Sequence, residues 1–307
     1  MADYAVFDIG GTAIKYGVTD GGGCFREKGQ TPNPARTDGV GAMIALLTAR
    51  LRAYKKAYPL AGVGVSTAGV VDPASGAIAY ASENIPGYRG TRLREILAQA
   101  AALPVAVEND ANCAALGEYW LGAGQGASPL VMLTLGTGVG GALLISGEIL
   151  RGALGFAGEV GYLPLGGGTL EELASAAALR RAVATAKDLP EDAVDGEMVF
   201  AWARAGDAAV QEALRQMMRR LARGIAMICY TVNPATVVIG GGISAEGAYL
   251  RPLLHEALSE TLLPEIFAGT KFFFARLGND AALLGALYHL RSLSTRGLAG
   301  GEKAEPP

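Results

Sequence analysis

The sequence predicts an α/β fold made of two related halves. Short apolar runs that end in glycine or polar residues alternate with segments whose apolar residues recur at helical spacing. A pattern of strand, Gly/Thr turn and second strand occurs twice, at 7–18 and at 133–144. The chain has 307 residues, more than the roughly 250–300 that one hydrophobic core usually accommodates, so two domains are expected.

The first half is expected to form a small N-terminal α/β domain at 1–121. Its elements, in chain order, are strands at 4–8 and 14–19, a helix at 41–56, a strand at 62–66, a helix at 91–102, a strand at 103–107 and a helix at 111–121. The stretch 122–129 is rich in glycine and ends in proline, and it marks the expected domain boundary.

The second half is expected to form a larger C-terminal α/β domain at 122–280. Its elements are strands at 130–135 and 142–145, helices from about 170 that include a long one at 208–231, and strands at 236–239 and 272–275. A last helix, at about 281–295, is expected to join the first domain. The residues at 296–307 have no apolar pattern and are expected to be a disordered tail.

Composition and charge exclude several classes of protein. Half of the residues are hydrophobic and 18% are charged, as in packed globular proteins. A net charge of −3 argues against binding to nucleic acid. The three cysteines have no paired spacing, which suits a reducing cytosol. The N-terminus lacks a signal-like segment and no apolar run approaches 18 residues, so we expect a cytoplasmic protein that does not bind membranes.

The segment Val107–Glu118 places polar residues directly behind an apolar run. Glu108, Asn109, Asp110 and Asn112 follow the expected strand at 103–107, and a helix begins at about Ala111. Open α/β sheets bind ligands where a strand ends and a helix begins, so Asp110 is a candidate catalytic residue. Capping of the helix by Asn109 or Asp110 explains this segment equally well on its own.

Glycine is over-represented, with 44 residues in the chain, against a usual share of about 7%. The clusters lie beside apolar runs, at 10–11, 136–141, 166–168 and 240–242. Glycine lets a backbone approach a ligand closely, so several loops are expected to converge on one polyanionic ligand.

The turn at 8–12 ends an apolar strand with a carboxylate, two glycines and a hydroxyl. We interpret Thr12 and the backbone N–H groups as contacts to the phosphates of ATP, with Asp8 near the metal ion. Lys15 either supports the phosphates or is a solvated strand residue. A hairpin turn capped by its own polar side chains is the alternative for this segment.

Two other nucleotide-binding patterns are disfavoured. Gly136, Gly138 and Gly141 have the spacing of the dinucleotide fingerprint, but the fingerprint requires a helix after the glycines. Residues 142–150 instead predict two strands and a turn. The Gly-Lys-Ser/Thr triplet of a P-loop is absent from the sequence.

Taken together, six segments resemble the ROK family of bacterial sugar kinases. They are D-I-G-G-T-A-I-K-Y-G-V at 8–18, G-V-S-T-A-G-V-V-D at 64–72, E-N-D-A-N at 108–112, L-G-T-G-V-G-G at 135–141, G-F-A-G-E-V-G at 155–161 and N-P-A-T-V-V-I-G-G-G-I at 233–243. The match is colinear from Ala2 to about Leu290. The resemblance implies a duplicated actin-like (ribonuclease H-like) ATPase fold of two domains with an interdomain cleft. It also implies a homodimer that uses ATP and Mg²⁺ to phosphorylate a sugar hydroxyl.

The resemblance assigns roles by position. Asp110 is expected to be the general base for the 6-hydroxyl of the sugar, with Asn109 as a sugar contact. Further sugar contacts are expected at Asn84, Glu159 and Glu171, although Glu171 also suits an ordinary first-turn helix acid. The expected phosphate contacts are Gly10, Gly11, Thr12, Thr137 and Gly138, and the expected adenosine-side contacts are Gly240, Gly241 and Gly242.

Tyr162 departs from the family pattern. Most ROK kinases have a histidine at this position, followed by cysteines that bind a structural zinc ion, whereas residues 163–169 contain no cysteine. We therefore predict no zinc site. The change at a sugar-binding position makes the chain similar to the zinc-free branch that contains β-glucoside kinases. Glucose or a cellobiose-like β-glucoside is the expected acceptor, with N-acetylmannosamine or another hexose as the alternative. A sugar-responsive regulator that lacks a DNA-binding domain, or an inactive sugar-binding protein, is a less favoured alternative.

Overall fold

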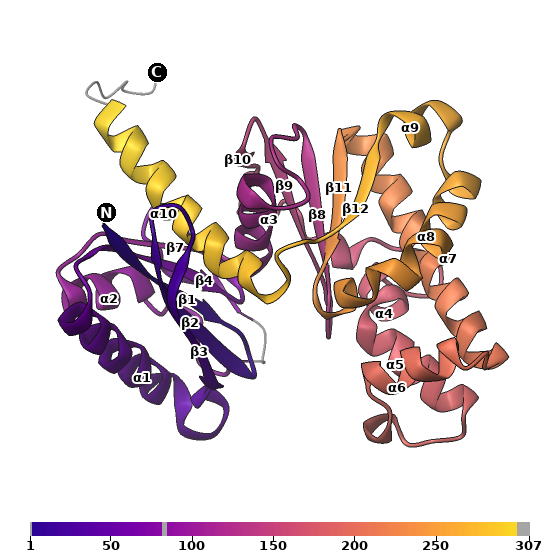
Figure 1. Cartoon of the computed structure of the whole chain (residues 1–307), viewed down its shortest axis with the longest axis horizontal. Coiled ribbons are helices and arrows are strands. Elements are labelled where there is room, and N and C mark those ends of the chain that lie inside the picture. The colour runs from indigo at the N-terminus through magenta and orange to yellow at the C-terminus, as the bar shows by residue number, and fades with distance from the viewer. Residues whose placement is uncertain (1, 82–84, 300–307) are drawn as a thin grey trace. The chain divides into compact units, whose positions relative to one another are not determined.

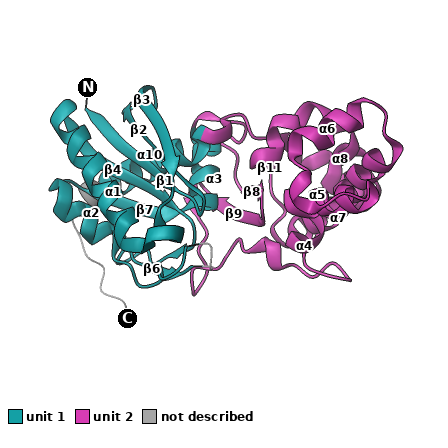
Figure 2. Ribbon diagram, turned by 90° about the horizontal axis from the view of Figure 1, so that it is seen from below, with its two compact units in different colours: residues 1–120, 280–307 teal, residues 121–279 magenta. Residues whose placement is uncertain are grey.

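The computed structural model describes residues 2–81 and 85–299, with side chains described as far as residue 295. It divides into two compact units (Figure 2): unit 1 consists of Met1–Trp120 and Asp280–Pro307, and unit 2 of Leu121–Asn279. The expected sugar contact Asn84 lies outside the described residues. None of the described helices is long and apolar enough to cross a membrane.

Unit 1 is built on a five-stranded sheet of order β3-β2-β1-β4-β7 (Figure 1). Its strands are β1 (Asp3–Ile9), β2 (Ala13–Asp20), β3 (Phe25–Pro32), β4 (Leu60–Thr67) and β7 (Val105–Asn109), and a small second sheet contains β5 (Val70–Val71) and β6 (Ile78–Tyr80). Its helices are α1 (Ala35–Ala57), α2 (Leu93–Ala101), α3 (Asp110–Leu121) and α10 (Ala281–Ala299).

The two faces of this sheet bury different residues. Phe7 and Ile9 belong to a core with residues of α1 and α2, whereas Val6 packs with Leu283 and Leu287 of α10. This alternation is the period-two pattern of a strand covered on both faces. Gly64 in β4 permits the close approach of α10, because a Cβ atom there would lie 2.6 Å from the carbonyl oxygen of Ala286.

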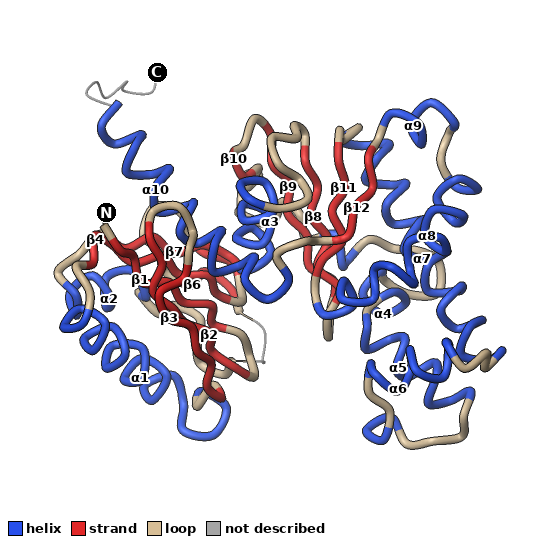
Figure 3. Tube along the Cα trace, viewed as in Figure 1, coloured by secondary structure: helices blue, strands red, loops and turns tan. Residues whose placement is uncertain are grey.

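Unit 2 is built on a second five-stranded sheet of order β10-β9-β8-β11-β12 (Figure 3). Its strands are β8 (Leu130–Leu135), β9 (Val139–Ile145), β10 (Glu148–Ile149), β11 (Thr236–Gly240) and β12 (Lys271–Phe274). Its α-helices are α4 (Leu170–Ala174), α5 (Ala176–Ala186), α6 (Gly196–Arg204), α7 (Ala208–Val232), α8 (Gly247–Thr261) and α9 (Pro264–Gly269). Short 3₁₀-helices are η1 (Val160–Tyr162), η2 (Glu191–Ala193) and η3 (Gly242–Glu246), and a fourth, η4 (Gly278–Asp280), lies where the chain returns to unit 1.

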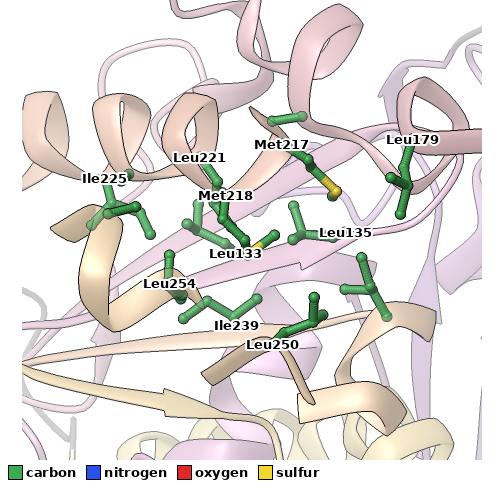
Figure 4. Packing of buried hydrophobic residues seen from close by; sticks show 14 of the residues in the cluster. Leu133, Leu135, Leu179, Met217, Met218, Leu221, Ile225, Ile239, Leu250 and Leu254 are labelled. Atoms are coloured by element: carbon green, nitrogen blue, oxygen red, sulfur yellow. The ribbon is translucent and has the colours of Figure 1, made fainter. Parts of the chain in front are cut away.

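The core of unit 2 lies between its sheet and α7 and α8. Leu221 and Ile225 of α7 face strand residues such as Leu133 and Ile239 in Figure 4, and all of them are fully buried. Helix α7 is capped by Asp207, whose carboxylate accepts the N–H groups of residues 209 and 210.

The two sheets have the same topology, which confirms the duplicated α/β fold. In each, a central strand pairs antiparallel with the next strand of a hairpin and parallel with a strand from later in the chain. The glycines at 136–141 lead into β9 and then β10 rather than into a helix, as expected. This arrangement does not match the dinucleotide fingerprint.

Some expected boundaries were wrong. The edge strand β3 was not expected, because most of its residues are exposed and form no apolar run. Helices α8 and α9 were likewise not expected as separate elements. Helix α1 begins before the expected residue 41, with non-helical torsion angles at Gly39 (φ 81°, ψ 169°) inside it. Helix α10 continues to Ala299, so residues 296–299, expected to be part of the tail, are helical.

Candidate active site

A row of polar side chains crosses the sheet of unit 1. Strand pairing aligns Lys15 of β2 with Asp8 of β1, Asp8 with Ser66 of β4, and Ser66 with Glu108 of β7. The Ser66 hydroxyl donates a 2.7 Å hydrogen bond to Asp8 Oδ1, and Lys15 Nζ lies 3.4 Å from Asp8 Oδ2. Asp8 is therefore held on both sides in a buried position. The sequence predicted Asp8 and Lys15 together, but it did not single out Ser66.

The turn after Asp8 is braced by Asn33. The backbone N–H of Gly10 donates to the carbonyl of Ala13 at 3.0 Å. Asn33 Nδ2 donates to the carbonyl of Gly10 at 2.8 Å, and the Asn33 N–H donates to the carbonyl of Thr12 at 2.9 Å. Sequence reasoning missed Asn33, whose only signal is a polar residue between two prolines.

Strand β7 ends at Asn109 and helix α3 begins at Asp110, two residues after and one residue before the expected bounds at Val107 and Ala111. Asp110 thus lies at a strand–helix junction, as the sequence predicted. Asn109 Oδ1 accepts the N–H of Asn112 at 3.1 Å, which is the bond of an N-cap residue. Asp110 Oδ1 accepts the N–H of Ala111 at 2.8 Å and a bond from Asn109 Nδ2 at 2.9 Å. Asn109 is thus the residue that caps the helix, and it also orients the carboxylate of Asp110.

The pKa of Asp110 is raised from 3.8 to about 6. Burial of the carboxyl group is the main cause of this higher pKa, and the negative charge of Asp8 is the second. Hydrogen bonds from Ala111 and Asn109 act in the opposite direction. A carboxylate with a pKa near 6 is ionised at neutral pH and is a better proton acceptor than an ordinary aspartate.

Glu108 fixes the backbone and side chains around Asp110 from within the protein. Its Oε1 atom accepts the N–H of Asn109 and a bond from Asn112 Nδ2, both at 2.9 Å. Its Oε2 atom lies 3.8 Å from Nε2 of His289 in α10. Because Glu108 is only 3% exposed, it is an internal acceptor rather than a ligand contact.

In unit 2, the turn between β8 and β9 is held by a carboxylate from α4. The Gly136 N–H donates to the Gly138 carbonyl at 2.9 Å, and the Val139 N–H donates to Glu171 Oε2 at 3.0 Å. A Cβ atom on Gly138 would lie 2.2 Å from the same oxygen, so only glycine leaves room for Glu171.

Glu159 lies near Glu171. The pKa of Glu159 is raised first by burial and then by the negative charge of Glu171. Glu159 precedes the 3₁₀-helix η1, and its side chain makes no capping bond to that helix. Tyr162, at the end of η1, is 68% exposed, and its N–H donates to the carbonyl of Glu159 at 3.3 Å. The structure therefore brings together Gly138, Glu159 and Glu171 from three segments of the chain.

Unit 2 also contains a pocket of about 730 Å³. It is lined by Leu135, Gly136, Thr137, Ala176, Ala177, Leu179, Arg180, Asp195, Gly196, Glu197, Val199, Phe200, Gly242, Ile243, Ala245 and Glu246. Of the expected nucleotide contacts in unit 2, Thr137 and Gly242 line it. Sequence reasoning missed its charged residues, Arg180 among them, because they lie on helices without a motif.

The other glycines expected around the ligand have different surroundings. A Cβ atom on Gly240 would lie 2.4 Å from Met132 Cε, and one on Gly241 would lie 2.3 Å from the carbonyl oxygen of Leu135. These two glycines allow close packing against β8. Gly166 and Gly167 have positive φ angles (70° and 89°) and form a turn before α4 that does not line the pocket.

The described residues contain no group of three or more His, Cys, Asp or Glu side chains that could hold a metal ion. The absence of zinc stays a prediction.

Comparison with known proteins identifies the family. The chain is 36% identical to a glucokinase of Halalkalibacterium halodurans, over 92% of this chain and 93% of that protein. It is 34% identical to a β-glucoside kinase of Listeria monocytogenes, over 93% of this chain and 96% of the other. A ROK family glucokinase from Streptomyces griseus, solved with glucose and AMPPNP, aligns with a TM-score of 0.83 at 29% identity and covers 95% of this chain and 100% of its own. The ROK family model matches residues 4–292, and this chain belongs to the ROK family.

Proposed function

We propose that this protein is an ATP-dependent sugar kinase that transfers the γ-phosphoryl group to the 6-hydroxyl of a hexose or β-glucoside. The observation that carries the proposal is the position of Asp110 together with its raised pKa. Its carboxylate lies at a strand–helix junction, beside Asp8, and has a pKa of about 6. The names of the glucokinase and β-glucoside kinase relatives support the acceptor class.

In this proposal the oxygen of the sugar 6-hydroxyl attacks the γ-phosphorus of ATP and ADP leaves. Asp110 accepts the proton of that hydroxyl during the attack. A positioned general base contributes about 10²–10⁴-fold to such a step. Asn109 orients the base, because its Nδ2 group donates both to Asp110 Oδ1 and, at 3.0 Å, to the Gly69 carbonyl. The glycine turn at 10–12 and Thr12 contact the phosphates.

The pocket in unit 2 is the proposed nucleotide site. Its volume of about 730 Å³ lies within the range of about 300–1,000 Å³ that is usual for small-molecule sites. Ala176 and Ala177 in the first turn of α5 line it, so the positive end of that helix favours an anion. Arg180 adds a positive charge, and Thr137 adds a hydroxyl from the turn between β8 and β9. AMPPNP in the Streptomyces griseus relative supports ATP as the donor.

Asp8 fits the magnesium ion that phosphoryl transfer from ATP requires. Mg²⁺ usually keeps several waters and binds one or two protein carboxylates together with the substrate phosphates. Asp8 supplies one such carboxylate, oriented by Ser66. When bound, Mg²⁺ neutralises the charge of the phosphates. We propose no protein-bound zinc.

Glu159, Glu171 and Tyr162 are the proposed sugar contacts of unit 2. Two neighbouring carboxylates suit a ligand that offers several hydroxyl donors, because each ionised carboxylate only accepts hydrogen bonds. Such a ligand also relieves their mutual repulsion by hydrogen bonding. Tyr162 adds an exposed ring with a hydroxyl group to the same segment.

The test is ATP consumption with glucose, cellobiose, gentiobiose, N-acetylmannosamine, allose and fructose, followed by NMR assignment of the phosphorylated carbon. We expect turnover with glucose or a β-glucoside and phosphate on carbon 6. Turnover confined to N-acetylmannosamine would overturn the acceptor assignment. Sugar binding without any ATP consumption would overturn the kinase assignment and favour a sugar-responsive protein.

A further inference from the structure

One carboxylate in unit 2 joins two parts of the proposed site. Glu171 is exposed at the start of α4, and its Oε2 atom accepts the backbone N–H of Val139, the first residue of β9. The proposed sugar contact is thus bonded to the end of the turn that holds Thr137 and Gly138, which we name the phosphate turn (residues 136–139). This bond spans 32 residues of sequence.

The surrounding backbone is packed so that the bond has little freedom. A Cβ atom on Gly161 would lie 2.4 Å from the carbonyl oxygen of Val139, so the segment after Glu159 lies directly against β9. On the other side, Gly138 contacts the carboxylate of Glu171. The bond from the Val139 N–H therefore links the position of the Glu171 carboxylate to that of the phosphate turn.

The carboxylate can accept more than one bond. An ionised glutamate has about four lone-pair sites on two oxygens, and the Val139 N–H uses one of them. A sugar hydroxyl can be accepted by the remaining sites. The charge of Glu171 acts on nearby Glu159, and a ligand that donates hydroxyl hydrogen bonds to both carboxylates would offset the repulsion between them.

We propose that Glu171 couples sugar binding to nucleotide binding, by holding the phosphate turn with one oxygen while it accepts a sugar hydroxyl with the other. The proposal rests on the proposed function, because it assigns the sugar to Glu171 and the phosphates to the turn. Sugar fixes the carboxylate more firmly and hence the turn, so the binding of nucleotide that follows costs the protein less conformational entropy. The coupling is reciprocal, so ATP raises the affinity for sugar by the same factor.

The coupling is measured by isothermal titration calorimetry of AMPPNP with Mg²⁺, in the absence and presence of saturating glucose, or of the acceptor that the ATP-consumption screen identifies. The ratio of the two dissociation constants is the coupling factor, and we expect about 5–150 for the wild-type protein. The reverse titration, sugar with and without AMPPNP, must give the same factor.

Three variants locate the coupling. Glu171→Ala removes the bond to the Val139 N–H and the proposed bond to the sugar hydroxyl. It should bring the coupling factor below about 2, because no side chain then contacts both the sugar and the phosphate turn. Gly138→Ala keeps the carboxylate but places a methyl group where its oxygen lies, and it should reduce the factor to the same level. The double variant should then show no further loss, because both changes break the same bond.

Glu172→Gln is the matched control. Glu172 lies in the first turn of α4, as Glu171 does, and forms a capping box with Thr169, a role that glutamine also fills. Its factor should equal that of the wild type.

The outcomes separate the two proposals. A wild-type factor near 1 overturns the coupling even if sugar is phosphorylated at the normal rate, and so does full coupling in Glu171→Ala. Failure of the proposed function has a different signature, in which the wild-type protein shows no sugar-dependent consumption of ATP.

Discussion

The hairpins β1–β2 and β8–β9 occupy the same place in two sheets of identical order, yet each obtains its carboxylate differently. In unit 1 the acid is Asp8, in the strand itself and paired with Lys15. The matching pair in unit 2 is Thr134 and Gly140. In both hairpins this pair lies next to the last residue pair before the turn. The acid of unit 2 is Glu171, which comes from helix α4.

This difference separates two tasks that phosphoryl transfer imposes. Asp8 is fixed by Ser66 in the interior of a sheet, which suits a carboxylate that keeps one position beside Asp110. Glu171 lies on an exposed helix start and contacts the turn from outside, which suits a group that responds to a ligand. Duplication thus preserved the hairpin, and the site was differentiated by the residues around it.

Substitution of Asp8, the fixed carboxylate of unit 1, should have the largest effect. Asp8→Asn removes the proposed carboxylate for Mg²⁺ and should lower kcat by about 10²–10³-fold, the usual loss for one electrostatic contact to a transition state. Thr134→Ser, at the matching position of unit 2, should change kcat by less than about threefold. Steady-state kinetics with saturating ATP and sugar measure both. Equal losses at the two positions would mean that the hairpins are not differentiated.

Substitution of Glu108 should lower kcat less than substitution of Asp8. Glu108→Ala leaves Asn109 N–H and Asn112 Nδ2 without their buried acceptor, so unfolding should require about 1–3 kcal/mol less. We expect kcat to fall about 10–100-fold, because a small misplacement of Asp110 costs rate. Glu108→Gln keeps an acceptor and should recover most of both losses. Chemical denaturation and kinetics on the same samples decide whether activity follows position or stability.

The pH dependence is a third test. Asp110 accepts a proton only when ionised, and its pKa is raised to about 6, so kcat/KM should fall as the pH decreases through 6 and reach about a tenth of its plateau at pH 5. Because Asp8 contributes to the raised pKa, the residual activity of Asp8→Asn should have its acid limb at lower pH. An acid limb that stays near pH 6 in that variant would contradict the proximity of the two carboxylates.

Local patterns made much of the fold predictable. Tyr4–Asp8, Leu130–Leu135 and Thr236–Ile239 are apolar runs that end at polar residues or glycine, and each lies in a strand. The junction at Asp110 was also predictable, because a buried strand is followed directly by polar residues and a helical pattern. Strand β3 had no such pattern, since an exposed edge strand needs no apolar face.

Contacts between distant segments were not predictable. Nothing in the sequence pairs Glu171 with Val139, and the packing reason for Gly240 and Gly241 depends on where β8 lies. The same holds for Asn33 and Glu108, whose roles are hydrogen bonds to backbone groups of the site. Motif resemblance predicts which residues contact the ligand, but it does not predict the residues that hold those contacts in place.

One variant distinguishes directly between Asp110 as a base and Asp110 as a structural residue. Asp110→Asn can retain the bonds from Ala111 and Asn109, because an amide oxygen accepts them as well. The pKa of Asp110 is about 6 in the folded protein, above its value of 3.8 when unfolded. Ionisation of Asp110 therefore destabilises the folded wild-type protein, and this destabilisation develops as the pH rises from about 4 through 6.

The measurement is kcat together with the free energy of unfolding of Asp110→Asn at pH 7.5 and pH 4. We expect kcat to fall by about 10²–10⁴-fold. At pH 7.5 the variant should be more stable than the wild type by about 1–3 kcal/mol, a gain that disappears at pH 4. Near-normal turnover with reduced stability would instead show that Asp110 is a structural residue of the helix start and not the base.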